Sequence, residues 1–189
     1  MTRLWMVRHG PTHANAMVGW SDIPADLSDK PALGRLRNFL PDAPVVSSDL
    51  IRATATADAL NPTHRLPNDP ALREINFGDW EMQTFTAVEA ADPKTIRAYW
   101  ETPGDVAPPN GESWNAVRAR VDQAIDSYLQ QDHGDLIIVA HFGAILTQVQ
   151  RALGLHAYAA FGHKIDNLSV TKINCGSSDW QVQHINHRP

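Results

Sequence analysis

The chain has 189 residues, of which 43% are hydrophobic and 20% are charged, and its formal net charge at pH 7 is −5. This length suits one globular domain with a sizeable core. The acidic balance argues against nucleic acid as the main partner, although a small pocket can still gather enough arginines to bind an anion. No apolar run approaches the ~20 residues that span a bilayer, so no membrane partner is expected.

The N-terminal residues and the cysteine content bear on the compartment. The apolar stretch within residues 1–9 is too short for the hydrophobic region of a secretory signal. Cys175 is the only cysteine, so it has no partner for an internal disulfide, which suits a reducing compartment. We therefore expect a cytoplasmic protein whose mature chain starts at Met1.

The first part of the chain predicts two short buried strands. Residues 4–7 form an apolar run that ends in the loop sequence Arg8-His9-Gly10-Pro11. Val45-Val46 indicates a second strand, and Ser47-Ser48-Asp49 after it are typical helix N-cap residues. A helix is expected to follow to about residue 60, with Arg52 outside its apolar face.

The second part of the chain contains the strongest helix signal. It runs from Ser113 to about Gln131, because apolar residues recur there at helical spacing. Residues 136–140 are uninterrupted apolar, which is typical of a strand covered on both faces. This run stops at His141, and a further helix is expected after it.

The remaining segments complete the expected fold. Residues 168–173 and 180–185 flank the turn-rich segment 174–179 and predict a hairpin at the sheet edge. Residues 77–112 interrupt the alternation of strands and helices, and we expect them to form a helical, lid-like excursion. The alternation elsewhere predicts a single α/β domain over residues 1–189, with three α/β/α layers and a mostly parallel sheet that has an antiparallel edge strand.

Charged and polar residues follow the ends of three predicted strands. Arg8 and His9 follow the first, Arg52 the second and His141 the third. Ligands of open α/β sheets bind at the carboxyl ends of the strands, and an arginine fork matches phosphate oxygens. A histidine in that place supplies a nucleophile or a donor to an oxyanion. Each residue alone has an ordinary explanation, such as a surface arginine or a capping histidine, but together they predict a phosphate site.

Four collinear segments carry a known pattern. An Arg-His-Gly tripeptide alone is weak evidence, whereas matches in the right order over about residues 3 to 145 are strong. The four segments are 8–15 (RHGPTHAN), 47–54, 72–81 and 139–143, with lesser matches at 19–22, 111–113 and 167–170. On these residues the sequence resembles the histidine phosphatase superfamily, also called the phosphoglycerate-mutase-like family.

The resemblance implies a phosphohistidine mechanism that needs no metal and no cofactor. His9 would be the nucleophile that becomes phosphorylated. Arg8, Arg52 and His141 would bind the phosphoryl oxygens, with Asn15 assisting. Because phosphoryl transfer leaves little covalent work for a protein, positioning and charge stabilisation would carry most of the catalysis.

Glu74 would be the general acid that protonates the leaving oxygen and then the base that activates water. Asp79 and Glu81 are close enough in sequence to compete for this role. The match to the Leu-Arg-Glu segment favours Glu74, and Glu81 is expected at the surface. Thr12 either contacts phosphate or only hydrogen-bonds within its own loop, and the ring of Phe142 is expected to narrow the substrate pocket.

Two neighbouring residues have supporting roles in this prediction. A nucleophilic histidine must be neutral at the attacking nitrogen, and a loop carbonyl such as that of Gly10 would orient its other nitrogen. Glu112 either holds an arginine in place or merely precedes Ser113, which is a plain helix N-cap.

Three functions compete for this chain. We favour a metal-independent phosphatase for a small phosphorylated metabolite, such as a sugar phosphate or α-ribazole phosphate. A phosphoglycerate mutase is the second hypothesis, and the compactness of the chain favours hydrolysis over it. A non-catalytic phospho-ligand binding module is the third, and the presence of His9, Glu74 and His141 argues against it. The sequence predicts neither the physiological substrate nor the oligomeric state.

Overall fold

The computed structural model describes residues 1–131, 133–177 and 179–189. Its sheet has the strand order β2-β3-β1-β4-β5. The strands are β1 (Thr2–Arg8), β2 (Val45–Ser47), β3 (Asp135–Ala140), β4 (Val170–Cys175) and β5 (Trp180–His187). β2, β3 and β1 run parallel, whereas β4 is antiparallel to β1 and β5 is antiparallel to β4. The predicted α/β sheet, mostly parallel with an antiparallel edge, is confirmed.

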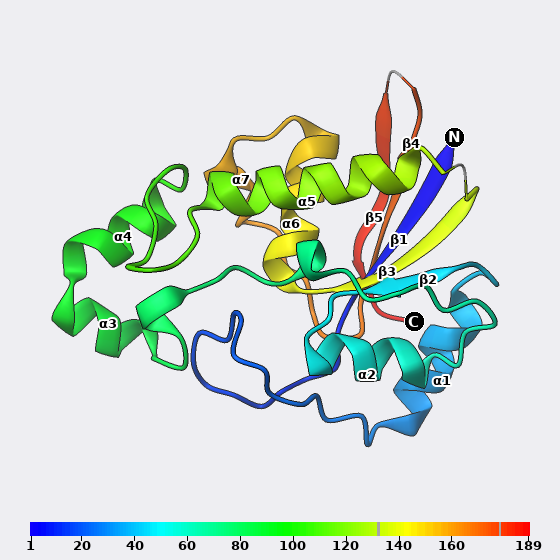
Figure 1. Cartoon of the computed structure of the whole chain (residues 1–189), viewed down its shortest axis with the longest axis horizontal. Helices are drawn as coiled ribbons and strands as arrows, with labels where there is room; N and C mark the ends of the chain where they lie inside the picture. Colours follow the sequence, from blue (N-terminus) through cyan, green and yellow to red (C-terminus); the bar gives the residue numbers. More distant parts are fainter. Residues whose placement is uncertain (132, 178) are drawn as a thin grey trace.

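Helices cover both faces of this sheet. They are α1 (Lys30–Phe39), α2 (Ile51–Ala59), α3 (Phe85–Ala91), α4 (Pro93–Glu101), α5 (Trp114–Leu129), α6 (Phe142–Leu153) and α7 (Ala157–Ala160), with 3-10 turns at Pro70–Leu72 and Gly78–Trp80. Figure 1 shows α5, α6 and α7 on one side of the sheet and α1 and α2 on the other, which gives the three layers. Within the described residues, no helix combines the length and hydrophobicity needed to cross a bilayer.

The side chains of β1 divide between two apolar cores, because successive residues of a strand point to opposite faces. Leu4 and Met6 belong to the core beneath α5 and α6. Val7 belongs to the core beneath α1 and α2. β3 lies between β1 and β2, so residues 136–140 are buried on both faces, as their unbroken apolar run predicts.

Two helix N-caps were predicted from the sequence, and one of them is confirmed while the other is wrong. Ser113 caps α5 by accepting a hydrogen bond from the N–H of Ala116 at 3.2 Å, as predicted. The N-cap predicted within residues 47–49 is wrong, because α2 begins only at Ile51 and has no side-chain cap. The carboxylate of Asp49 is engaged elsewhere, in an ion pair with an arginine from another segment.

The hairpin at the sheet edge and the excursion at residues 77–112 both interrupt the alternation of strands and helices. β4 and β5 form the predicted hairpin at the sheet edge, although its expected turn includes Ser178, which lies outside the described residues. Residues 77–112 hold α3 and α4, which project beyond the sheet (Figure 1). Trp80 and Tyr99 are buried there with ring centroids 5.7 Å apart, so these aromatic side chains pack the excursion itself. Its role as a lid stays a prediction.

Candidate active site

The carboxyl ends of the parallel strands gather the candidate residues. His9 follows β1 and His141 follows β3, and these strands are hydrogen-bonded neighbours. The ring centroids of the two histidines lie 5.0 Å apart. Arg52 comes from the first turn of α2, and Glu74 comes from the loop after the 3-10 turn Pro70–Leu72. The structure thus collects on one site residues that are up to 132 positions apart in the chain (141 − 9 = 132).

The imidazole of His9 is oriented by its own loop. Its Nδ1 lies 2.6 Å from the carbonyl oxygen of Gly10, as predicted. A carbonyl only accepts hydrogen bonds, so Nδ1 carries the proton and Nε2 retains a lone pair. Asn167 donates to the His9 carbonyl at 2.8 Å, and the Gly10 N–H donates to the Thr56 hydroxyl at 3.0 Å. The loop that carries His9 and Gly10 is therefore held at several points.

Both histidines are neutral in this environment. Burial, and then the positive charges of Arg52 and Arg8, lower the pKa of His9 to about 3. Burial also lowers the pKa of His141 well below its ordinary value, and the neighbouring His9 adds to this effect. Desolvation disfavours the charged form of a histidine, so each ring stays unprotonated near neutral pH.

The free energy of unfolding is expected to fall as the pH drops below about 6.5. In the unfolded chain these histidines have pKa values near 6.5 and take up protons that the folded protein excludes. The unfolded state therefore binds more protons between about pH 6.5 and about pH 3, and stability decreases over that range. Thermal melts of wild type and His9→Asn at about pH 7.5 and about pH 5 check this. The decrease in Tm should be smaller in His9→Asn, and an equal decrease in both proteins would contradict the assignment.

The two arginines are held by backbone carbonyls, and neither forms an ion pair with a carboxylate within the described residues. Arg52, which is only 1% exposed, donates to the carbonyl oxygens of Ser21 at 2.9 Å and Gly19 at 2.5 Å. Arg8 donates to the carbonyl oxygen of Ile165 at 2.6 Å. The Nε atom of each guanidinium is buried and has no hydrogen-bond partner within the part of the chain that the structure describes.

His141 completes a set of buried, unpartnered polar groups. It stands before the first residue of α6 but forms no side-chain capping bond, so capping does not explain it. Both of its ring nitrogens are buried without a partner among the described residues. An unsatisfied buried polar group costs about 1–3 kcal/mol, so such groups rarely gather in one place without a reason. Together with Arg8 and Arg52, the arrangement suits an anion with several oxygens.

The carboxyl group of Glu74 lies against the start of α6. Its Oε1 accepts from the N–H groups of Ile75 at 3.0 Å and Gly143 at 2.9 Å. Burial raises the pKa of Glu74, despite these bonds and the nearby arginines. A Cβ at Gly143 would come within 2.4 Å of Glu74 Oε1, so the close approach requires glycine. A buried carboxyl group with a raised pKa is suited to exchange protons with substrate.

Asp79 and Glu81, the two alternatives to Glu74 as the general acid, both bind other groups. Asp79 is exposed and accepts from the amide of Asn110 at 3.1 Å. The expectation that Glu81 is a surface carboxylate is wrong, because it is half-buried and accepts the backbone N–H groups of residues 19–21. Its neighbours come from a distant loop that sequence spacing does not reveal. In the part of the chain described, no three histidine, cysteine or carboxylate side chains are arranged to hold a metal ion.

Glu112 does hold an arginine in place, and the arginine is Arg120 on α5. Arg120 donates to both carboxylate oxygens of Glu112, at 2.9 and 2.8 Å. It also donates to the carbonyl oxygens of Arg73 at 3.0 Å and Glu74 at 3.2 Å, so it supports the segment that carries Glu74. Neither Arg120 nor Thr56 was predicted from the sequence. The expectation that Glu112 holds an arginine was the signal that pointed to Arg120.

The remaining predicted substrate-binding residues differ in their positions. Phe142 is half-buried at the start of α6, and the guanidinium of Arg8 lies over its ring at 5.6 Å, which places it at the site. Thr12 is half-buried and Asn15 is exposed. Neither side chain hydrogen-bonds to another described residue, so no polar contact ties them to the cluster. The roles of all three stay predictions.

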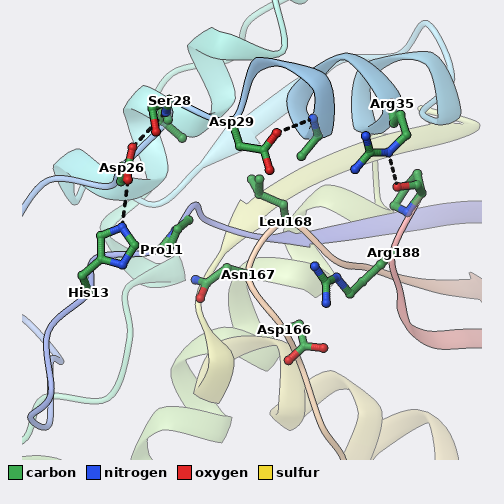
Figure 2. A pocket seen from close by; sticks show the side chains of 13 residues that line it. Pro11, His13, Asp26, Ser28, Asp29, Arg35, Asp166, Asn167, Leu168 and Arg188 are labelled. Carbon is green, nitrogen blue, oxygen red and sulfur yellow. Dashed lines mark hydrogen bonds and ion pairs between the residues drawn. The ribbon is translucent and has the colours of Figure 1, made fainter.

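A pocket of about 430 Å³ opens beside the loop that follows His9, with Pro11 and His13 in its lining. Figure 2 shows His13 and Asp26 at one side of it, joined by a hydrogen bond of 2.8 Å. Asn167 lines this pocket and also binds the backbone of His9. The side chains of Arg8, His9, Arg52, Glu74 and His141 do not line this pocket.

The sequence model of the histidine phosphatase superfamily (branch 1) matches residues 4–188. This chain belongs to the histidine phosphatase superfamily. It is 32% identical to the adenosylcobalamin/alpha-ribazole phosphatase of Salmonella typhimurium, over 87% of this chain and 86% of that protein. The family resemblance of the sequence is confirmed.

Two further proteins similar to this chain are named for different activities. A protein of Erwinia tasmaniensis named for phosphoglycerate mutase activity is 29% identical, over 95% of this chain and 88% of that protein. The solved structure of a mycobacterial glucosyl-3-phosphoglycerate phosphatase has a TM-score of 0.83 and 27% identity, over 99% of both chains. The proteins similar to this chain are thus named either as phosphatases or as a mutase, and the phosphatase structure shares its fold.

Proposed function

We propose that this member of the superfamily is a phosphomonoesterase that transfers the phosphoryl group of a small metabolite first to His9 and then to water. One observation carries the proposal. A neutral His9, with its Nδ1 proton bound to Gly10, lies near nitrogen atoms of Arg8, Arg52 and His141 that have no hydrogen-bond partner among the described residues. A neutral imidazole nitrogen is a nucleophile, and fixed donors around it stabilise charge on phosphoryl oxygens.

In the first step, the Nε2 lone pair of His9 attacks phosphorus. A P–N bond forms and the P–O bond to the leaving group breaks. Glu74, whose pKa is raised by burial, gives its proton to the leaving oxygen, so the product departs as a neutral alcohol. Arg8, Arg52 and His141 bind the phosphoryl oxygens throughout.

In the second step, a water molecule attacks the phosphohistidine. The carboxylate of Glu74, now deprotonated, takes a proton from this water as its oxygen bonds to phosphorus. The P–N bond breaks, and the electron pair returns to His9 Nε2. Inorganic phosphate leaves, and both His9 and Glu74 are restored to their starting protonation states.

We propose a small phosphate monoester of a sugar or a nucleotide-like compound as the substrate class. The similar proteins are named for α-ribazole phosphate and for glucosyl-3-phosphoglycerate. We propose that the reaction takes place in the cytoplasm, because a single cysteine suits a reducing compartment. Residues 77–112 would act as a lid over the substrate, with Phe85, which is 43% exposed, available to contact it.

Wild-type protein is expected to hydrolyse 4-nitrophenyl phosphate in the presence of a chelator. The proposed chemistry uses only side chains of the chain itself, so chelation should leave kcat/KM unchanged. The release of nitrophenolate and of inorganic phosphate in equal amounts is the measurement. Pure wild-type protein that shows no turnover of this ester or of a panel of phosphorylated metabolites would refute the proposal.

A phosphoglycerate mutase is the second candidate, because a similar protein is named for that activity. A mutase returns the phosphoryl group to a second hydroxyl of the substrate, so its turnover depends on a bisphosphorylated primer. Assays of 3-phosphoglycerate with and without 2,3-bisphosphoglycerate separate the two. We expect slow release of phosphate and no primer-dependent isomerisation.

A further inference from the structure

Glu81 has no part in the proposed chemistry, yet several hydrogen bonds converge on its carboxylate. Its Oε2 accepts from the N–H groups of Gly19 and Ser21, both at 3.1 Å, and from the Ser21 hydroxyl at 2.7 Å. Its Oε1 accepts from the N–H groups of Trp20 at 2.7 Å and Phe77 at 3.0 Å. Burial opposes ionisation, but these bonds hold the pKa of Glu81 below its ordinary value. The carboxylate is therefore charged near neutral pH.

The same short loop holds Arg52 on its other side. Gly19 and Ser21 each donate a backbone N–H to Glu81, and each accepts a hydrogen bond from the Arg52 guanidinium with its carbonyl oxygen. Glu81 and Arg52 are therefore linked twice, once through the backbone of Gly19 and once through the backbone of Ser21. The remaining Nε of Arg52 is one of the buried donors of the candidate site that have no partner among the described residues.

The loop depends for its shape on contacts with other segments, which include backbone hydrogen bonds of Met17 to residues 82 and 83. Residues 11–29 contain no helix or strand, so no ladder of backbone hydrogen bonds fixes them. Gly19 is packed so tightly that a Cβ there would come within 2.0 Å of the Ile75 carbonyl oxygen. The indole of Trp20 donates to the carbonyl oxygen of Glu74 at 2.9 Å. Residues 19–21 thus lie between the backbone of Glu74 and Ile75 on one side and the carboxylate of Glu81 on the other.

We infer that Glu81 is a positioning residue, which fixes the guanidinium of Arg52 against the phosphoryl group by holding Gly19 and Ser21. This inference rests on the proposed function, because the position of Arg52 matters only if Arg52 binds the transferred group. In Glu81→Gln an amide NH₂ replaces one carboxylate oxygen and faces N–H donors of the loop, so the two carbonyl oxygens shift. A misplacement of about 1 Å in such a site costs about 100-fold in rate.

The test is a double-mutant cycle of Glu81→Gln and Arg52→Ala, with Asp42→Asn, an exposed carboxylate outside the site and the excursion, as the control. The readouts are kcat/KM for 4-nitrophenyl phosphate and for an alkyl phosphate, the Kd of inorganic phosphate, and Tm. We expect Glu81→Gln to lower kcat/KM about 100-fold for both esters when Arg52 is present, and to have little effect when Arg52 is Ala. Asp42→Asn should match wild type.

Several outcomes would overturn the inference. Equal losses from Glu81→Gln in both backgrounds would mean that Glu81 acts independently of Arg52, as a merely structural residue would. A loss confined to the alkyl ester would make Glu81 a proton donor. If Glu81→Gln does not fold, Ser21→Ala in the same cycle removes one of the bonds and should show a smaller loss with the same dependence on Arg52. Inactive wild type would refute the proposed function, whereas active wild type with additive losses refutes only this inference.

Discussion

His9→Ala is expected to lower kcat for 4-nitrophenyl phosphate by roughly 10⁴- to 10⁶-fold, as the loss of a covalent nucleophile does in other enzymes. The imidazole Nε2 is the atom that accepts the phosphoryl group, and alanine offers no substitute. Rapidly quenched wild type incubated with a ³²P-labelled ester should carry an acid-labile, base-stable label, which peptide mapping places on His9. The variant should carry none.

His156→Ala is the matched control for this experiment. His156 is an exposed histidine before α7 and forms no side-chain capping bond. Its removal should leave kcat and labelling unchanged. Undiminished turnover by His9→Ala would refute the phosphohistidine mechanism. Wild type that binds phosphate but shows neither label nor turnover would instead indicate a non-catalytic phospho-ligand binding module.

Glu74→Gln is expected to lower kcat/KM for an alkyl phosphate by roughly 10²- to 10⁴-fold, the usual worth of a general acid. The loss should be much smaller for 4-nitrophenyl phosphate, because nitrophenolate departs without a proton. Burial raises the pKa of Glu74, so its acid form persists to higher pH than that of an exposed glutamate. In wild type, kcat/KM for the alkyl ester should therefore fall as the pH rises through this pKa, and Glu74→Gln should lack that decrease.

The comparison of two esters makes this prediction specific to proton transfer. Steady-state rates over a range of pH, at several concentrations of each ester, are the measurement. Asp79→Asn is the control, because Asp79 is an exposed carboxylate in the same segment, and it should behave as wild type. Equal losses of Glu74→Gln on both esters would show that Glu74 does not act as the acid. A loss in Asp79→Asn limited to the alkyl ester would assign that role to Asp79.

The sequence by itself determined the architecture, because local patterns carry that information. An unbroken apolar run at residues 136–140 predicts a strand buried on both faces, and β3 occupies that place. Helical spacing after Ser113, with a serine that caps the first turn, predicts α5. The carboxyl ends of parallel strands meet at one edge, so Arg8, His9 and His141 had to lie near one another. Their approach was predictable without any knowledge of side-chain contacts.

Only the tertiary structure decided how these residues are held. Glu81 accepts hydrogen bonds from residues about 60 positions earlier in the chain, and no local pattern distinguishes such a carboxylate from a solvated one. Arg120 reaches the backbone of Glu74 from a helix 46 residues later. The expected N-cap near Asp49 failed for the same reason, since Arg73 takes that carboxylate into an ion pair. Residue type and order determine the strands and the reacting groups, whereas the partners of buried charges depend on which distant backbone groups the fold leaves facing them.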